Sequence, residues 1–370
     1  MKASSPGRML AKRLALDIVL CGLALVVFAL FHHVLPRSQE PLGIVITNPY
    51  STTDSGSSAV PDERHLLAYS GAAGTVSDTG GTLKAARGRM GGGTSEKGGS
   101  ALTGEDQQVE AEASTPLAEK FADKYSEEVV VTGNSYTSPD ISVEVTEHTT
   151  ENGRVTYYLA DIYVRDITCF QSALAGGSYG SGFRDEITDM AQSSSAILAV
   201  NGDYYGNTRE GVVIRNGVIY RANATDCDVC VLYYDGTMRV MPGSAFSVEE
   251  AIEDGAWQAW TFGPALLDAD GGALTQFSSS NRIISSNPRT AIGYWEPGHY
   301  CMVVVDGRGE SAGITLPDLS QLFAELGCKA AYNLDGGNSS VMVWQNEIIN
   351  QPSGGGRASS DALLITEAGQ

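Results

Sequence analysis

The sequence has few of the residues on which several common kinds of catalysis depend. It contains five histidines in 370 residues, and only His148 and His299 follow residue 126. Gly309-Glu-Ser-Ala-Gly313 matches the GxSxG pattern of serine hydrolases, but no histidine follows it to act as the base. Asp306-Gly-Arg308 also separates that serine from the strand before it. Phosphate-loop and dinucleotide-binding motifs are missing as well. A Ser-His-Asp mechanism and nucleotide-binding folds of these kinds are therefore excluded.

Basic residues are scarce in the larger part of the chain. Residues 127–370 contain 11 arginines and one lysine (Lys329) against 31 Asp and Glu, a net charge of −19, whereas residues 1–126 carry −1. Without a basic cluster, this domain is not expected to bind nucleic acid. It also repels anions at long range, so an anionic substrate would have to be held by a few well-placed arginines.

Cysteines are too few for a disulfide scaffold. Five lie in the domain, and an odd number leaves at least one thiol free or paired to another chain. Cys227-Asp-Val-Cys230 has metal-ligand spacing, but no second CxxC and no nearby histidine completes a zinc site. A local disulfide or unpaired thiols are the expected states, and no metal site is assigned to cysteine.

The N-terminal part contains the one long apolar run. Leu14 to Phe31 is broken only by Asp17 and follows four basic residues, a pattern typical of a membrane-spanning helix with its positive flank in the cytoplasm. A cleaved signal peptide is the alternative, although the run is long for one. We expect a basic cytoplasmic tail at 1–13, a transmembrane signal anchor at 14–35 and a single-pass cell-membrane protein with its C-terminal domain outside.

Residues 36–126 are rich in Gly, Ser, Thr, Ala and charge, and we expect a disordered linker there. The remaining residues, 127–370, alternate in the way strands do, with helices expected at 185–193 and 316–326. Many strands and few helices predict the α+β class, with one catalytic domain built round a single mixed sheet.

Three expected strands end in polar turns that contain aspartate. These turns are Asn201-Gly-Asp203, Asp306-Gly-Arg308 and Asn333-Leu-Asp335-Gly336-Gly337. The last continues through Asn338-Ser339-Ser340 to another apolar run, which predicts two strands joined by a glycine turn. Separated carboxylates could supply the acid and the base or nucleophile of a glycosidase, or they could bind a divalent cation such as calcium. No cofactor is required by these residues.

Several of these segments, taken in order, resemble the phosphodiester glycosidase family over about residues 129–368. The segments are Asn201-Gly-Asp-Tyr-Tyr205, Arg215-Asn-Gly217, Phe262-Gly-Pro264, Asn287-Pro-Arg-Thr-Ala-Ile-Gly293, Val305-Asp-Gly-Arg308, Ser311-Ala-Gly313, Asn333 to Ser340, Asn350-Gln-Pro-Ser353, and Arg357 with Asp361. The resemblance implies hydrolysis of the bond between an anomeric sugar carbon and a phosphodiester, in bacterial exopolysaccharide or cell-wall glycan metabolism. The family usually has three glycines where this chain has Gly336-Gly337-Asn338, so the turn relies on the tolerance of asparagine for positive φ.

The resemblance and the motifs together give a set of site residues as a hypothesis. Asp335 and Asp203 form the acid/base or nucleophile pair, and Asp306 orients Arg308 or a cation. The phosphodiester is held by Arg289 and Arg308, with Arg215 or Arg357 assisting. Sugar hydroxyls or phosphate oxygens are bound by Asn201, Asn333 and Ser339, and Gly336 and Gly337 allow close approach of the ligand. The expected substrate is an N-acetylglucosamine-like sugar 1-phosphodiester. The alternative is a non-catalytic surface module that binds such sugar phosphates, and a purely structural scaffold is a third interpretation.

Overall fold

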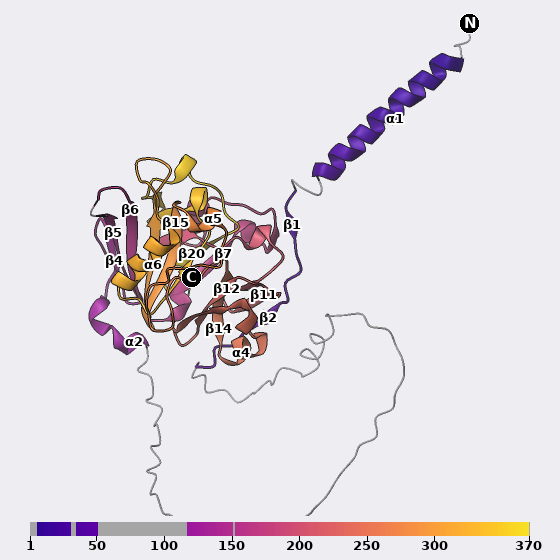
Figure 1. Ribbon diagram of the computed structural model, residues 1–370. Helices are drawn as coiled ribbons and strands as arrows, with labels where there is room; N and C mark the ends of the chain where they lie inside the picture. The colour runs from indigo at the N-terminus through magenta and orange to yellow at the C-terminus, as the bar shows by residue number, and fades with distance from the viewer. Residues whose placement is uncertain (1–5, 31–34, 51–116, 151, 370) are drawn as a thin grey trace, which may run out of the picture. The chain divides into compact units, whose positions relative to one another are not determined.

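Strands dominate the computed structural model, which describes residues 6–30, 35–50, 117–150 and 152–369 (Figure 1). All the described residues belong to one compact unit. Most of the predicted linker, residues 51–116, lies outside the described residues. Helix α1 (Pro6–Ala29) overlaps the segment at 14–35 where we expected a transmembrane anchor. No helix in the described part of the chain is both long and apolar enough to cross a membrane.

The strands in the described residues form four sheets. The seven-stranded sheet contains β3 (Val130–Val131), β4 (Ser135–Thr137), β5 (Ile141–Thr149), β6 (Thr156–Val164), β15 (Arg289–Glu296), β16 (His299–Val305) and β17 (Ala330–Asn333). The six-stranded sheet contains β2 (Ile44–Val45), β10 (Val212–Arg215), β11 (Val218–Ala222), β12 (Asp228–Tyr233), β13 (Met238–Pro242) and β14 (Ala256–Thr261). The five-stranded sheet contains β7 (Phe170–Leu174), β9 (Leu198–Asn201), β18 (Met342–Trp344), β19 (Glu347–Ile348) and β20 (Asp361–Ile365), and β1 (Arg37–Ser38) pairs with β8 (Gly180–Ser181).

The strand orders are β17-β15-β16-β6-β5-β4-β3, β13-β12-β14-β10-β11-β2 and β19-β18-β9-β20-β7. Every strand pair between described residues is antiparallel. The predicted α+β class is confirmed. The prediction of a single mixed sheet is wrong, because the described strands form several sheets and pair in the antiparallel direction. Local apolar alternation identifies strands without specifying which distant strands pair, so the sequence could not separate the sheets.

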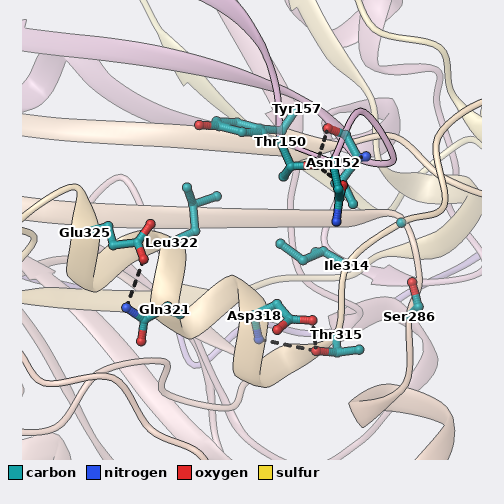
Figure 2. Close-up of a pocket in the computed structure, with 12 residues that line it drawn as sticks. Thr150, Asn152, Tyr157, Ser286, Ile314, Thr315, Asp318, Gln321, Leu322 and Glu325 are labelled. Carbon is teal, nitrogen blue, oxygen red and sulfur yellow. Dashed lines mark hydrogen bonds between the residues drawn. The ribbon is translucent and has the colours of Figure 1, made fainter.

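Helices are few and short. Besides α1 they are α2 (Leu117–Lys120), α3 (Ile187–Ser193), α4 (Val248–Glu253), α5 (Asn281–Ile284) and α6 (Leu316–Glu325). The two helices predicted from sequence are α3 and α6. Helix α6 begins at a Thr315 cap, whose hydroxyl accepts a hydrogen bond from the Asp318 N–H at 3.2 Å and donates to the Asp318 carboxylate at 2.7 Å (Figure 2). Its Leu316, Leu319 and Phe323 are fully buried against one face of the seven-stranded sheet.

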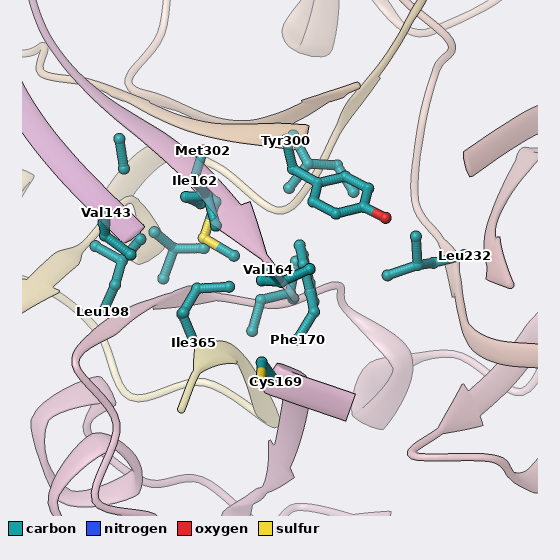
Figure 3. Close-up of a cluster of buried hydrophobic side chains, with 14 of the residues drawn as sticks. Val143, Ile162, Val164, Cys169, Phe170, Leu198, Leu232, Tyr300, Met302 and Ile365 are labelled. Carbon is teal, nitrogen blue, oxygen red and sulfur yellow. The ribbon is translucent and has the colours of Figure 1, made fainter. Parts of the chain in front are cut away.

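The largest core lies where the three big sheets meet. Figure 3 shows Val143 and Ile162 of the seven-stranded sheet beside Leu198 and Ile365 of the five-stranded sheet, with Leu232 of β12 nearby. Strand β16 is buried on both faces, one against this core and the other against α6, which explains its unbroken apolar sequence.

A segment that we expected in the linker belongs to the folded domain. Strand β1 pairs with β8, and β2 adds an edge strand to β11. The Ile46 N–H donates to the Gly217 carbonyl at 2.7 Å, and the Ile46 side chain is 1% exposed in a cluster with β10, β11 and α4. These strands are two residues long, too short to produce a periodic sequence signal.

Candidate active site

The segment from Leu334 to Val341 carries the polar residues singled out in the sequence. It leaves β17 in the seven-stranded sheet and enters β18 in the five-stranded sheet, so the predicted pair of strands is a crossing between two sheets. Gly337 has a φ of +69°, and a Cβ there would lie 3.2 Å from the Arg308 guanidinium. Asn338 has no positive φ and lies within a short 3₁₀ helix (Gly337–Ser339), so the third family glycine is not needed for backbone conformation.

Asp335 projects from this crossing, and neighbouring groups hold its carboxylate in place. Its Oδ1 accepts a hydrogen bond from the Gly336 N–H at 2.9 Å, and its Oδ2 lies 2.7 Å from Nη2 of Arg357. The side chain retains 14% exposure. Burial raises the pKa of the Asp335 carboxyl above its usual range, while Ser339 and Arg357 oppose that shift. Asp335 is thus a mostly desolvated carboxylate that still faces solvent.

A cleft of about 520 Å³, which we call the arginine cleft, opens in front of Asp335. It is lined by Tyr204, Phe262, Ser280, Arg282, Ile283, Asn287, Arg289, Arg308, Asp335, Gly336, Gly337, Asn338 and Arg357. Six of the predicted site residues are among them. Asp335 is the single carboxylate in a lining that includes four arginines, so within an acidic domain this cleft is suited to an anionic ligand.

A second hollow of about 240 Å³, the serine pocket, shares Tyr204, Asp335 and Arg357 with the arginine cleft. Its remaining lining is Arg184, Asp203, Asn207, Ser339, Ala358, Ser359 and Ser360. Arg184 donates to the Ser360 hydroxyl at 2.8 Å and to the Asn207 amide oxygen. Four hydroxyl side chains and one amide line this pocket beside two arginines and two aspartates, and hydroxyls and amides are groups that bind neutral sugar hydroxyls. Asp335 therefore lies between the arginine cleft and a pocket in which hydroxyl side chains are the most numerous.

Asp203 and Arg215 lie deeper than predicted. The Asp203 Oδ1 accepts from the Tyr205 N–H at 2.9 Å, and its Oδ2 accepts from the Thr261 N–H at 3.0 Å. Arg215 is 1% exposed and bridges Asp203, at 3.0 Å, and Asp361, at 2.7 Å. Arg215 lines neither hollow, so the structure places it behind the site, and Asp203 reaches only the serine pocket.

Asn201 and Asn333 are fully buried and bind backbone. The Asn201 amide donates to the Asp335 carbonyl at 2.7 Å, and its oxygen accepts from the Thr290 hydroxyl at 2.6 Å. The Asn333 amide donates to the Gly263 carbonyl at 2.8 Å. The structure therefore places Asn201 as a brace for the Asp335 backbone, away from direct ligand contact.

Asp306 lies apart from both hollows. Its carboxylate accepts from the Asn350 side chain at 2.8 Å and from the Gln351 N–H at 3.0 Å, and it lines a separate hollow of about 150 Å³. Burial raises the pKa of the Asp306 carboxyl, and these hydrogen bonds oppose the shift. Asp306 therefore holds the 350–351 turn, whereas Arg308 is held by Asn287 and Asn338. No group of three His, Cys, Asp or Glu side chains within the described residues could hold a metal ion.

Twelve of the residues that line the two hollows were not predicted as site residues. Among them, Tyr204, Phe262 and Asn287 lie inside sequence segments that we singled out, so the signal was present but no role followed from it. Arg184 and Arg282 are the two arginines among the twelve. No local motif marks these two arginines, because their importance comes from tertiary proximity to Asp335 and Arg308.

Comparison with known proteins agrees with this architecture. Residues 194–366 match the phosphodiester glycosidase family. The SPbeta prophage-derived uncharacterized protein YomE of Bacillus subtilis (strain 168) is 32% identical over 196 residues, which cover 51% of this chain. The match spans only 30% of that longer protein.

One of the solved structures that resemble this chain shares its fold. The zebrafish N-acetylglucosamine-1-phosphodiester alpha-N-acetylglucosaminidase catalytic domain, auto-inhibited by its pro-peptide, superposes with a TM-score of 0.51 and 21% identity over 65% of this chain and 88% of that one. A hypothetical protein from Synechocystis matches with a TM-score of 0.49 and 12% identity, covering 61% of this chain and 62% of that one. Residues 194–366 are thus similar to the phosphodiester glycosidase family, and the domain shares its fold with the zebrafish catalytic domain.

Proposed function

We propose that this domain is a hydrolase that releases a sugar from a sugar 1-phosphodiester. The observation that carries the proposal is the position of Asp335, the one carboxylate that lines both the arginine cleft and the serine pocket. A sugar in the serine pocket would place its anomeric carbon near Asp335 and its phosphate among the arginines. N-acetylglucosamine, the sugar in the name of the zebrafish enzyme, is the first sugar to test.

In the proposed step, the bond between C1 of the sugar and the phosphate oxygen breaks, and its electron pair leaves with that oxygen. The oxygen of a water molecule bonds to C1, one water proton stays on the new sugar hydroxyl, and the other goes to the released phosphate monoester. Arg308 and Arg289 stabilise the departing anion. Positive charge develops on the sugar ring, and the Asp335 carboxylate stabilises it.

Arg357 has a distinct part in this proposal. Burial favours the protonated form of Asp335, but the Arg357 guanidinium at 2.7 Å favours the carboxylate.

Asp203 was predicted as the partner of Asp335. Its two backbone hydrogen bonds and its ion pair with Arg215 leave it little freedom, so we propose that it fixes the turn that carries Tyr204.

The test is sugar release by the full chain from the methyl phosphodiester of N-acetylglucosamine 1-phosphate. We expect free N-acetylglucosamine with the wild type and a loss of at least about a hundredfold with Asp335→Asn. Asp318→Asn is the matched control, because Asp318 lines another hollow, on α6 (Figure 2). Saturable binding without release would favour the non-catalytic binding module, and neither binding nor release would contradict both.

The cellular setting is proposed from sequence alone. The apolar run at 14–31 and its basic flank support attachment to the cell membrane with the domain outside, in exopolysaccharide or cell-wall glycan metabolism. Fractionation of cells that express the full chain, with external protease added to intact cells, tests this setting. Recovery of the chain in the cytoplasm, protected from protease, would contradict it.

A further inference from the structure

The arginine cleft has more positive charge than a single phosphodiester would neutralise. Of its four arginines, Arg357 is paired with Asp335. The other three, Arg282, Arg289 and Arg308, form no ion pair with any carboxylate in the described part of the chain. Because the Arg357–Asp335 pair is neutral, three uncompensated cations face the cleft.

Arg289 is the strongest sign that an anion belongs there. It is 3% exposed, and its guanidinium donates to the carbonyls of Ile283, Ser285 and Ile314. These acceptors satisfy hydrogen bonds but bring no negative charge. Burial, and then the neighbouring Arg308, lower the pKa of Arg289 to about 10. A buried cation without a counter-ion is costly, and a bound anion would remove that cost.

Arg308 is fixed in place before any ligand arrives. Its Nη1 donates to the Asn338 amide oxygen at 2.9 Å and its Nη2 to the Asn287 amide oxygen at 2.8 Å. Its φ of +61° is uncommon for a residue with a side chain. Asn338 replaces the third glycine of the family pattern, so this chain has gained an oxygen that orients Arg308 without neutralising its charge.

Arg282 extends the positive region beyond these two arginines. It lies on the one-turn helix α5, whose carbonyls are fastened by Arg289 and by the Asn287 amide, which donates to the Arg282 carbonyl at 2.9 Å. Asn287 therefore contacts both the Arg308 guanidinium and the Arg282 backbone. The side chain of Arg282 is solvent-exposed at the cleft lining and forms no hydrogen bond or ion pair with the described residues.

We propose that the leaving group carries two phosphoryl groups in sequence, so that the substrate class is a sugar 1-diphosphate ester. This inference rests on the proposed function and narrows it. A monophosphodiester carries one negative charge, whereas a diphosphate diester carries two and has enough oxygens to contact Arg289, Arg308 and Arg282 together. Hydrolysis breaks the C1–O bond, water supplies the oxygen that remains on C1, and the second water proton goes to the released diphosphate monoester.

Binding of inorganic anions tests the inference without turnover. We would titrate the full chain with inorganic pyrophosphate and with inorganic phosphate by calorimetry, at low ionic strength and with a chelator present. Pyrophosphate is expected to bind at least about tenfold more tightly, the size of one added charge-assisted hydrogen bond. Arg282→Gln is expected to remove that difference and to change phosphate affinity by less than about twofold.

Arg165→Gln is the matched control, because it removes an exposed cation whose recorded contact is with the Pro139 carbonyl, outside the cleft. Equal affinity for the two anions, binding of neither, or equal weakening of both by Arg282→Gln would overturn the inference. Sugar release from the methyl monophosphodiester, measured on the same preparation, reports on the proposed function separately. If the chain hydrolyses the monophosphodiester but does not prefer pyrophosphate, the proposed function stands and the proposed diphosphate substrate is overturned.

Discussion

Truncation of Ile46 to alanine should destabilise the whole domain, although this residue lies well before the predicted domain boundary at residue 127. Ile46 is 1% exposed, whereas its neighbour Val45 is 67% exposed. The two residues belong to the same edge segment and differ mainly in burial. Val45→Ala is therefore a matched control that removes apolar carbons from the solvent side of the same segment.

The magnitude follows from the burial of one side chain. Removing a buried isoleucine side chain down to Cβ costs about 2–5 kcal/mol of unfolding free energy, because transfer and cavity costs add. The Ile46 N–H to Gly217 carbonyl bond of 2.7 Å survives in the alanine variant, so the loss comes from packing. For a domain of this size, each kcal/mol corresponds to ~2–4 °C in the melting temperature. Val45→Ala should change stability by less than about 0.5 kcal/mol.

Urea unfolding monitored by tryptophan fluorescence measures both variants, since Trp257 and Trp260 lie on β14 in the same sheet. An Ile46→Ala midpoint equal to wild type would refute the claim that residues 37–46 are part of the domain. Equal losses in the two variants would refute the burial argument. The same result decides where a soluble protein for assays should begin, because a chain starting at 126 would lack β1 and β2.

Three further predictions concern the site. Asp203→Asn should lower the melting temperature, because the Asp203 carboxylate accepts hydrogen bonds from two backbone N–H groups and forms an ion pair with Arg215. An unchanged melting temperature would contradict this structural role. Gly337→Ala should weaken anion binding measured by calorimetry and cost about 1–2 kcal/mol of stability, since φ is +69° and Arg308 is 3.2 Å from the new carbon; wild-type values would contradict this. Burial raises the pKa of Asp361 to about 8, with Arg215 opposing the shift and Asp203 adding to it, so between about pH 4 and 8 the folded state holds a proton that the unfolded state releases. The free energy of unfolding should fall as pH rises from about 4 to 8, and Asp361→Asn should flatten that slope in urea titrations; a slope unchanged by the substitution would refute the assignment.

Local sequence patterns predicted the elements better than their assembly. The apolar sequence of β16 and the proline in the first turn of α6 were sufficient, because burial and proline geometry act within a few residues. The two strands predicted on either side of Asn333–Ser340 are present as β17 and β18, but they lie in different sheets and do not pair with each other. Nothing in that segment indicates that β17 pairs with β15 while β18 pairs with β9, since these partners lie far away along the chain.

The sequence predicted those site residues that lie in turns or beside glycines. Asp335, Gly336, Gly337, Arg289, Arg308 and Arg357 were named from turns and glycines, and they line one cleft. The positions of Arg215 and Asp361 were not predictable, because their ion pair joins residues 146 positions apart. Arg282 and Arg184 lacked a motif for the same reason. Whether a charged residue faces a ligand or another buried charge depends on tertiary packing.

The most direct test of the central claim is hydrolysis of the methyl phosphodiester of N-acetylglucosamine 1-phosphate in water enriched in ¹⁸O, with the products analysed by mass spectrometry. Cleavage of the C1–O bond predicts ¹⁸O in the released sugar and none in methyl phosphate, with both products lost in Asp335→Asn. Label in the phosphate product would show phosphodiesterase chemistry, and undiminished release by Asp335→Asn would remove Asp335 from the reaction. Either result would contradict the account.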